Sequence, residues 1–257
     1  MIAQFTLRLL CGMSMMWSIM PRHEVTSGFF RIQMLVALGL SVLAALAFGS
    51  FGTAGNESRV LLSVPAGVWS CVGLAVAAFL GSIAWTLERR RAGTWFVFVI
   101  AFGSACVLVL SSVPNSLQFS GASLLLLSEL SSALLLGGAT TGMLLGHWYL
   151  TAPTMSIAPL QRLTAYFGMA ASLRLVLSAL GLLLVWGQVN ANIHWLWLAL
   201  RWTAGIFAPI LVAVMVWRIL RYRNTQAATG VFFVAVIFTF IGELTAMLLW
   251  QELSMPL

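Results

Sequence analysis

Eight long apolar runs dominate this chain of 257 residues, and they leave few folds open to it. A helix of about 20 apolar residues crosses a hydrocarbon core of roughly 30 Å. The runs are too long for the strands of a transmembrane barrel and lack the alternation of such strands. Because 61% of the residues are hydrophobic and only 7% are charged, we predict an all-α, polytopic transmembrane helix bundle. The predicted spans are residues 3–20, 32–50, 66–87, 94–112, 122–146, 164–186, 196–217 and 229–250.

The first run has one face that is more polar than the rest. Polar residues recur along it at helical spacing, at Gln4, Arg8, Cys11, Ser14 and Ser18. Amphipathic helices of this kind can lie in the membrane interface instead of crossing the bilayer. The sequence therefore predicts eight spans, or seven if the first segment is interfacial. In either case we expect residues 1–257 to form a single integral membrane domain with short loops.

The charged residues indicate how the chain is oriented in the membrane. All 13 basic residues are Arg, all 6 acidic residues are Glu, and the formal net charge is +7. Arginines collect in alternate loops, at Arg22, Arg31, Arg89, Arg90, Arg91, Arg162, Arg218, Arg221 and Arg223. By the positive-inside rule these loops are cytoplasmic, and their charge meets anionic lipid rather than nucleic acid. The restriction to Arg and Glu is typical of a GC-rich bacterial genome, so we expect a bacterial inner membrane.

Four charged side chains lie inside the predicted spans, namely Glu129, Arg174, Arg201 and Glu243. A charge at the bilayer centre costs roughly 2.5–3.5 kcal/mol on insertion scales, so such residues usually face a bundle interior, pair or work. At 1.5 Å per residue, three of them lie about 7–10 Å below the outer surface, with Arg174 nearer to mid-membrane. Two interpretations stay open. The charges form structural pairs that neutralise one another, or they line a quinone site or a proton path, to which His147 also belongs.

The last four predicted spans also carry residues that shape helix packing. Gly138, Gly142 and Gly146 recur at every fourth residue of the fifth span. Such a row lets another helix backbone approach closely. In the seventh span, Pro209 cannot donate a hydrogen bond to the carbonyl four residues earlier, so we expect a kink or a freed carbonyl there. With the buried charges, these features make residues 122–250 the candidate functional half.

No motif in the sequence names a reaction. The HExxH, Walker A, GxSxG and CxxCH patterns are missing, so a self-contained metalloprotease, NTPase, hydrolase or c-type cytochrome has no support. Cys11, Cys71 and Cys106 lack metal-ligand spacing. The 3 histidines cannot supply the axial ligands of two haems, and one haem on His23 and His147 is a minor alternative. We predict no metal site, no covalently bound cofactor and no haem, and whether the chain is an enzyme stays open.

Gly242–Glu243–Leu244 in the last span carries a resemblance to a known family. In this local context, and in span number and orientation, the chain resembles the membrane-anchor subunits of bacterial molybdenum and iron–sulfur oxidoreductases, of the dimethyl-sulfoxide-reductase and polysulfide-reductase type. The resemblance implies a subunit of a respiratory complex that anchors partner subunits, contributes to a quinone site and binds no haem. Glu243, Glu129 and the two arginines then lie near the quinone head or a proton path. Two alternatives stay open: a secondary transporter or channel for a small solute, and a non-catalytic scaffold subunit.

Overall fold

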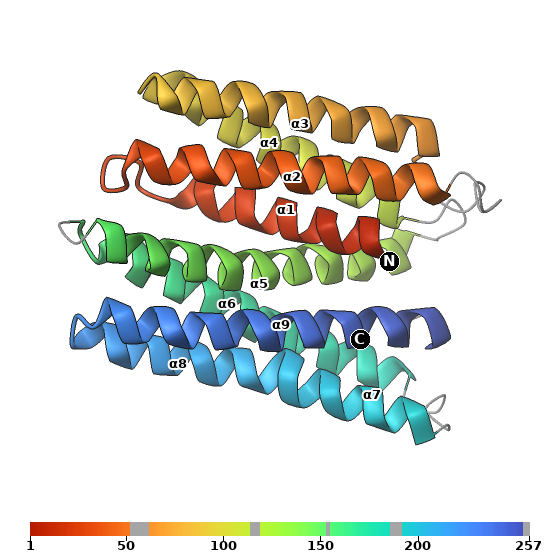
Figure 1. The fold of residues 1–257 in the computed structure, drawn as a ribbon. Coiled ribbons are helices and arrows are strands. Elements are labelled where there is room, and N and C mark those ends of the chain that lie inside the picture. Colours follow the sequence, from red (N-terminus) through yellow and green to blue (C-terminus); the bar gives the residue numbers. More distant parts are fainter. Residues whose placement is uncertain (52–61, 114–118, 153–154, 186–191, 254–257) are drawn as a thin grey trace. The chain divides into compact units, whose positions relative to one another are not determined.

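The computed structural model describes the chain except for residues 52–61, 114–118, 153–154, 186–191 and 254–257. Every secondary-structure element in the described part is helical (Figure 1). The elements are α1 (Ile2–Ile19), α2 (Ser27–Phe51), α3 (Val64–Thr86), α4 (Arg90–Ser112), α5 (Phe119–Thr151), α6 (Ala158–Val185), α7 (Asn192–Trp202), the π-helical segment η3 (Thr203–Phe207), α8 (Ala208–Arg221) and α9 (Thr225–Leu253). Among the residues that the structure describes, eight segments are long and apolar enough to cross a membrane, with α7, η3 and α8 forming one of them. The predicted all-α bundle is confirmed, and the chain is a multi-pass integral membrane protein.

The segment whose crossing the sequence left open, α1, is one of these eight. It has 18 residues, of which 67% are buried. Buried residues lie on several sides of it, among them Leu7, Leu9, Gly12 and Met13. A helix that lies on a bilayer surface keeps one face in water. The enclosure of α1 therefore favours a true first span.

The described contacts divide the chain into two compact units, Met1–Gly137 (unit 1) and Gly138–Leu257 (unit 2). The division falls within α5, whose first part belongs to unit 1 and whose second part belongs to unit 2. In unit 1, α2 packs on α3, α1 packs on α2 and α4, and α3 packs on α4. In unit 2, α9 packs on α7 and α8, and α6 packs on α8.

The core of unit 1 combines aromatic stacking with a close approach of two helix backbones. The rings of Phe30 in α2 and Trp85 in α3 stack with their centroids 4.6 Å apart. Between α1 and α5, a β-carbon at Gly12 would overlap the backbone of Ala133, and one at Gly137 would overlap the backbone of Gly12. Small residues permit this kind of approach between membrane helices. α1 is thus held in the interior of unit 1.

In unit 2 the second part of α5 packs against α9 through glycine. A β-carbon at Gly142 would overlap the ring of Phe232, and one at Gly146 would overlap Thr229. The Phe232 ring also contacts the ring of Phe167 in α6, at a centroid distance of 5.9 Å. Two members of the glycine row therefore take part in helix packing around α9.

The connection between α5 and α6 is shorter than the sequence suggested. The predicted fifth span ends at residue 146, and the predicted sixth span begins at residue 164. Instead α5 continues to Thr151 and α6 begins at Ala158. Pro159 is the second residue of α6, where a missing N–H costs no intrahelical hydrogen bond. This proline starts the helix instead of excluding it.

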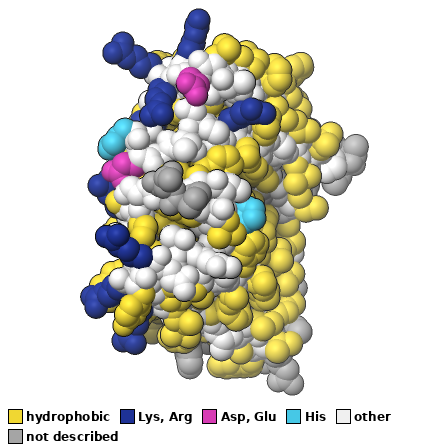
Figure 2. Space-filling view, turned by 60° about the vertical axis from the view of Figure 1, so that its left-hand side comes forward, with side chains coloured by type: hydrophobic (Ala, Val, Ile, Leu, Met, Phe, Trp, Pro, Cys, Tyr) yellow, Lys and Arg dark blue, Asp and Glu magenta, His cyan; other side chains and the backbone are white. Residues whose placement is uncertain are grey.

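Large apolar side chains cover much of the outer surface of the helices. Trp69, Trp95 and Phe102 are 73%, 73% and 76% exposed. In water such an extensive apolar surface would be a docking or aggregation site, whereas in a bilayer it faces lipid. Figure 2 shows arginine side chains projecting beside broad apolar areas. This surface agrees with helices that cross the hydrocarbon core and carry their cations at their ends.

A buried arginine and glutamate cluster as the candidate functional site

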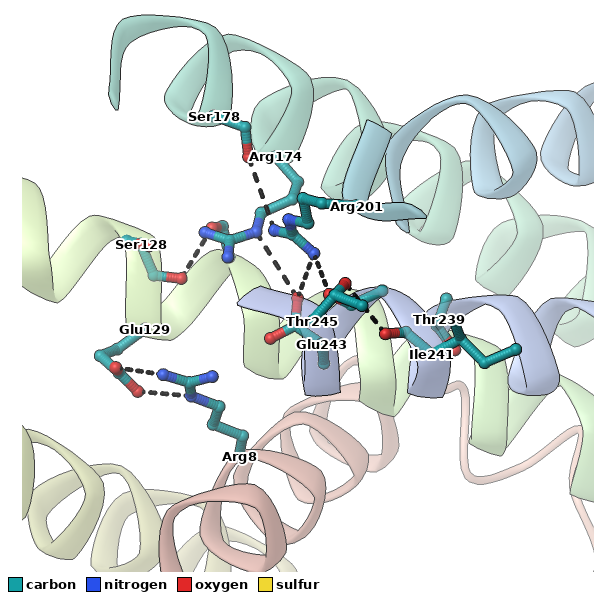
Figure 3. Close-up of polar contacts among 12 residues, drawn as sticks. Arg8, Ser128, Glu129, Arg174, Ser178, Arg201, Thr239, Ile241, Glu243 and Thr245 are labelled. Carbon is teal, nitrogen blue, oxygen red and sulfur yellow. Dashed lines mark hydrogen bonds and ion pairs between the residues drawn. The ribbon is translucent and has the colours of Figure 1, made fainter. Parts of the chain in front are cut away.

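Three of the predicted intramembrane charges meet in unit 2 (Figure 3). Arg174 comes from α6, Arg201 from α7 and Glu243 from α9. Nη1 of Arg201 lies 3.1 Å from Oε1 of Glu243, and Nε of Arg174 lies 3.6 Å from the same oxygen. The three side chains are at most 3% exposed. This Arg–Glu cluster therefore shares one carboxylate between two guanidinium groups in an enclosed place.

Arg201 makes the closer contacts of the two arginines. Its Nη1 also donates to the carbonyl of Gly242 at 3.0 Å, and its Nη2 lies 3.5 Å from Oγ of Ser178. The Gly242 carbonyl accepts a second hydrogen bond, from Oγ1 of Thr245 at 2.8 Å. Charge-assisted hydrogen bonds of this type are stronger than neutral ones. Together they hold the Arg201 guanidinium in one orientation against α9.

Two glycines let α9 approach η3 closely enough for these bonds to form. A β-carbon at Gly242 would overlap the backbone of Gly205. One at Gly205 would overlap Gly242 and press on the Arg201 guanidinium. The missing β-carbons therefore bring the Gly242 carbonyl within reach of Arg201.

The irregular segment η3 directly follows the helix that carries Arg201. Pro209 is near the start of α8 and has no N–H to donate to the carbonyl of Gly205. The N–H of Ala208 donates to the carbonyl of Thr203, five residues earlier, which is the π-helical pattern. Single π-helical turns are frequent at functional sites. Where the sequence suggested a kink or a freed carbonyl, the chain forms a π-helical turn.

Glu129, the fourth predicted charge, pairs in unit 1 with Arg8 of α1 (Figure 3). Nε of Arg8 donates to Oε2 of Glu129 at 2.7 Å, and Nη2 donates to Oε1 at 2.5 Å. The side chains are 11% and 8% exposed. Two parallel bonds of this kind give a pair both strength and a defined geometry. The sequence did not predict this pairing, although the polar face of α1 that contains Arg8 was a signal for it.

The pairing of Glu129 with Arg8 changes the charge balance inside the helices. The four predicted charges, two Glu and two Arg, sum to zero. The Arg8–Glu129 pair is neutral by itself, so two positive charges and one negative charge remain in the Arg–Glu cluster, a net charge of +1. A buried charge without a full counter-charge is costly. An anion or an electronegative ligand atom beside the guanidinium groups reduces that cost.

The other predicted site residues lie apart from the Arg–Glu cluster. His147 is exposed and lies four residues before the end of α5 at Thr151, whereas the cluster is enclosed. Gly138 is buried and is the first residue of unit 2. The contact between α5 and α1 in unit 1 uses the preceding residue, Gly137.

Neither a group of metal ligands nor one of three cavities in the described part of the chain includes the Arg–Glu cluster. Among the described residues, no group of three or more His, Cys, Asp or Glu is arranged to hold a metal ion. A polar cavity lies at the ends of α5, α6 and α9, an apolar groove lies between α2 and α3, and a smaller one lies between α3 and α4. The cluster residues line none of these three.

The chemistry available to the cluster follows from its groups. Guanidinium groups stabilise negative charge on an oxygen that they contact. A carboxylate in the same place can accept a proton and later return it. The cluster is thus suited to binding an electronegative group and exchanging a proton with it. No protein-family model, curated protein or solved structure matches this chain.

Proposed function

We propose that this chain is the integral membrane subunit of a bacterial electron-transfer complex and that its Arg–Glu cluster acts on the head group of a quinone. The observation that carries the proposal is the net charge of +1 in the buried cluster. The cluster is centred on Gly242 and Glu243, two of the three residues that carry the resemblance to oxidoreductase anchor subunits. Its position inside apolar helices suits a ligand that dissolves in the bilayer.

Quinone chemistry uses the groups that the cluster offers. The carbonyl oxygens of a quinone accept hydrogen bonds, and they gain negative charge during reduction. A guanidinium aimed at such an oxygen stabilises the charge as it develops. We assign this role to Arg174, which has the longer contact to Glu243, while Arg201 stays bound to Glu243 and Gly242. Glu243 then exchanges the proton that accompanies the electron.

The proposed complex also defines an orientation. By the positive-inside rule we assign the arginine-bearing helix ends to the cytoplasmic face of the inner membrane. These ends include residues 20–26 between α1 and α2, residues 87–89 between α3 and α4, and residues 222–224 between α8 and α9. Soluble partner subunits would dock on the helix ends of the membrane domain.

A secondary transporter for a small anion is the second candidate. Two observations favour it, the net positive charge of the cluster and the π-helical turn beside Arg201. Discontinuous helices in transporters expose backbone groups to a substrate near the middle of the membrane. A transporter of this kind works without redox partners, so the absence of co-purifying redox subunits distinguishes it from the first candidate.

A scaffold subunit is the third alternative, in which the buried charges only hold the helices together.

The first experiment is purification of the tagged chain from its native membrane in a mild detergent, followed by mass spectrometry and a visible absorption spectrum. We expect co-purifying iron–sulfur, molybdenum or cytochrome subunits. A colourless protein without partners would overturn the proposal and favour transport.

In the purified complex, Arg174→Gln should lower quinone-linked turnover by about 10²–10³-fold, the usual cost of removing one oxyanion donor.

The matched control is Arg31→Gln, which removes an exposed arginine of α2 and should leave turnover unchanged. If Arg174→Gln loses the partner subunits instead of turnover, the cluster has a structural role and the scaffold alternative gains. If it changes neither, the quinone assignment is wrong.

A further inference from the structure

A polar cavity lies in unit 2, where the α5–α6 and α8–α9 connections come together. Its volume is about 530 Å³, and its polar lining consists of Tyr149, Ser156, Gln161, Arg223 and Thr225. Sites for small molecules in proteins usually have volumes of about 300–1,000 Å³. The cavity is therefore large enough for a phosphate group together with the part of a lipid that carries it.

The cavity lies at the strongly basic end of unit 2. Four arginines occur near these helix ends, at Arg162 in the first turns of α6, at Arg218 and Arg221 in the last turn of α8, and at Arg223 in the following connection. The acidic residues of unit 2 are both in the second half of α9. The nearer one, Glu243, is 18 residues beyond Thr225, or about 27 Å along the helix. Positive charge at this end is thus not offset by a nearby carboxylate on α9.

Internal hydrogen bonds hold the walls of the cavity. Tyr149 is buried, and its hydroxyl donates to the carbonyl of Ser156 at 2.5 Å. Oγ of Ser156 accepts the N–H of Ala158 at the start of α6. Across the cavity, Oδ1 of Asn224 accepts the N–H of Ala227 at 2.9 Å and so begins α9. These bonds brace the described residues that line the cavity from both connections.

Arg223 is the cation that lines this cavity. Its neighbour Arg221 lies over the ring of Trp217, with the guanidinium carbon 3.8 Å from the ring centroid, and does not line the cavity. Arg223 has a backbone φ of 55°, in the left-handed region that favours glycine. Glycine at this position would relieve the backbone, so a fold-preserving substitution that removes the cation is available.

We propose that this cavity binds the phosphate group of an anionic phospholipid, with Arg223 as its principal contact. Basic pockets between transmembrane helices are a recurring site for the head groups of anionic lipids. A guanidinium pairs with phosphate through two parallel hydrogen bonds, and hydroxyl and amide groups like those of Ser156, Thr225 and Gln161 add further donors. Lipid phosphate groups lie at the level where transmembrane helices end, and this cavity lies at the ends of α5, α6 and α9. The proposal is independent of the quinone assignment, because it uses no residue of the Arg–Glu cluster.

The test uses the full chain, freed of lipid in detergent and titrated with phosphatidylglycerol or phosphatidylcholine while bound lipid is counted by native mass spectrometry. Arg223→Gly should weaken phosphatidylglycerol binding by more than tenfold and leave the melting temperature equal or higher. Arg218→Gln removes an exposed arginine of α8 outside the cavity. It should weaken binding by at most about fivefold, the loss of one general surface attraction. Arg223→Asn, another residue tolerated in the left-handed region, is the second variant if the glycine variant does not fold.

Three results would overturn the proposal. Equal losses in Arg223→Gly and Arg218→Gln would mean a diffuse surface attraction and no site. Equal binding of phosphatidylcholine and phosphatidylglycerol would mean that net charge is not recognised. Inorganic phosphate that binds the lipid-free chain as tightly as phosphatidylglycerol would assign the cavity to a soluble phosphate compound instead of a lipid.

Discussion

Replacing Glu243 by Gln removes the shared counter-charge of two buried arginines, and its cost can be worked from the geometry. Nη1 of Arg201 lies 3.1 Å and Nε of Arg174 lies 3.6 Å from Oε1 of Glu243, and the carboxylate is fully enclosed. Removing one partner of a buried ion pair typically costs about 3–5 kcal/mol, since the remaining charge is left uncompensated. In Glu243→Gln the net charge of the cluster rises from +1 to +2. We expect the free energy of unfolding to fall by this amount.

Arg174→Gln is the matched control, and the charge count predicts a much smaller effect. It leaves the Arg201–Glu243 contact in place and brings the cluster to neutrality. The contact between Arg174 and Glu243 is lost, and a hydrogen bond to a charged group is worth roughly 1.5–3 kcal/mol. The expected difference between the two variants is therefore about 2 kcal/mol, or roughly thirtyfold in the folding equilibrium.

The assay is equilibrium unfolding by sodium dodecyl sulfate in mixed micelles, followed by the reactivity of cysteine thiols. Cys11 and Cys71 are fully enclosed in the folded chain and become reactive when the helices separate. The midpoint should shift furthest for Glu243→Gln. Equal destabilisation by Glu243→Gln and Arg174→Gln, or none in either, would refute the reasoning that Glu243 is the counter-charge of the cluster.

Three further predictions concern helix contacts and use the same assay. Arg8→Gln and Glu129→Gln should each lower the free energy of unfolding by about 3–5 kcal/mol, because each leaves one buried charge without its partner. The double variant should lose less than the sum of the two, and additive losses would argue against the bidentate pair. Gly12→Ala should weaken the α1–α5 contact by about 1–3 kcal/mol, because the added β-carbon overlaps the backbone of Ala133. An unchanged unfolding midpoint would contradict the close approach of α1 to α5. Gly242→Ala should destabilise by a similar amount through its overlap with η3. The control for both glycines is Gly39→Ala, where nothing lies within 4 Å of the added carbon; it should be neutral or stabilising by up to about 1 kcal/mol.

The sequence carried enough information to predict the helices and the residues of the Arg–Glu cluster. Apolar length and composition are local properties, so eight candidate spans and the buried charges Arg174, Arg201 and Glu243 follow from the order of residues alone. The irregularity near Pro209 follows for the same reason, because it depends on a missing N–H in its own helix. At 1.5 Å per residue, the order of residues also puts charges from different spans at comparable depths.

The partners of these residues depend on which helices become neighbours. Arg8 and Glu129 are 121 positions apart, and no local pattern states that α1 packs on α5. The same holds for Gly205 and Gly242, whose approach brings a carbonyl to Arg201. Hydrophobic periodicity indicates which side of a helix is enclosed, but it does not indicate which helix encloses it.

The sequence by itself determined a multi-pass helical membrane protein with charges in its interior. Only the tertiary structure decided that one glutamate is neutralised by Arg8 and that the other is shared by two arginines, because pairing is a property of the packed helices.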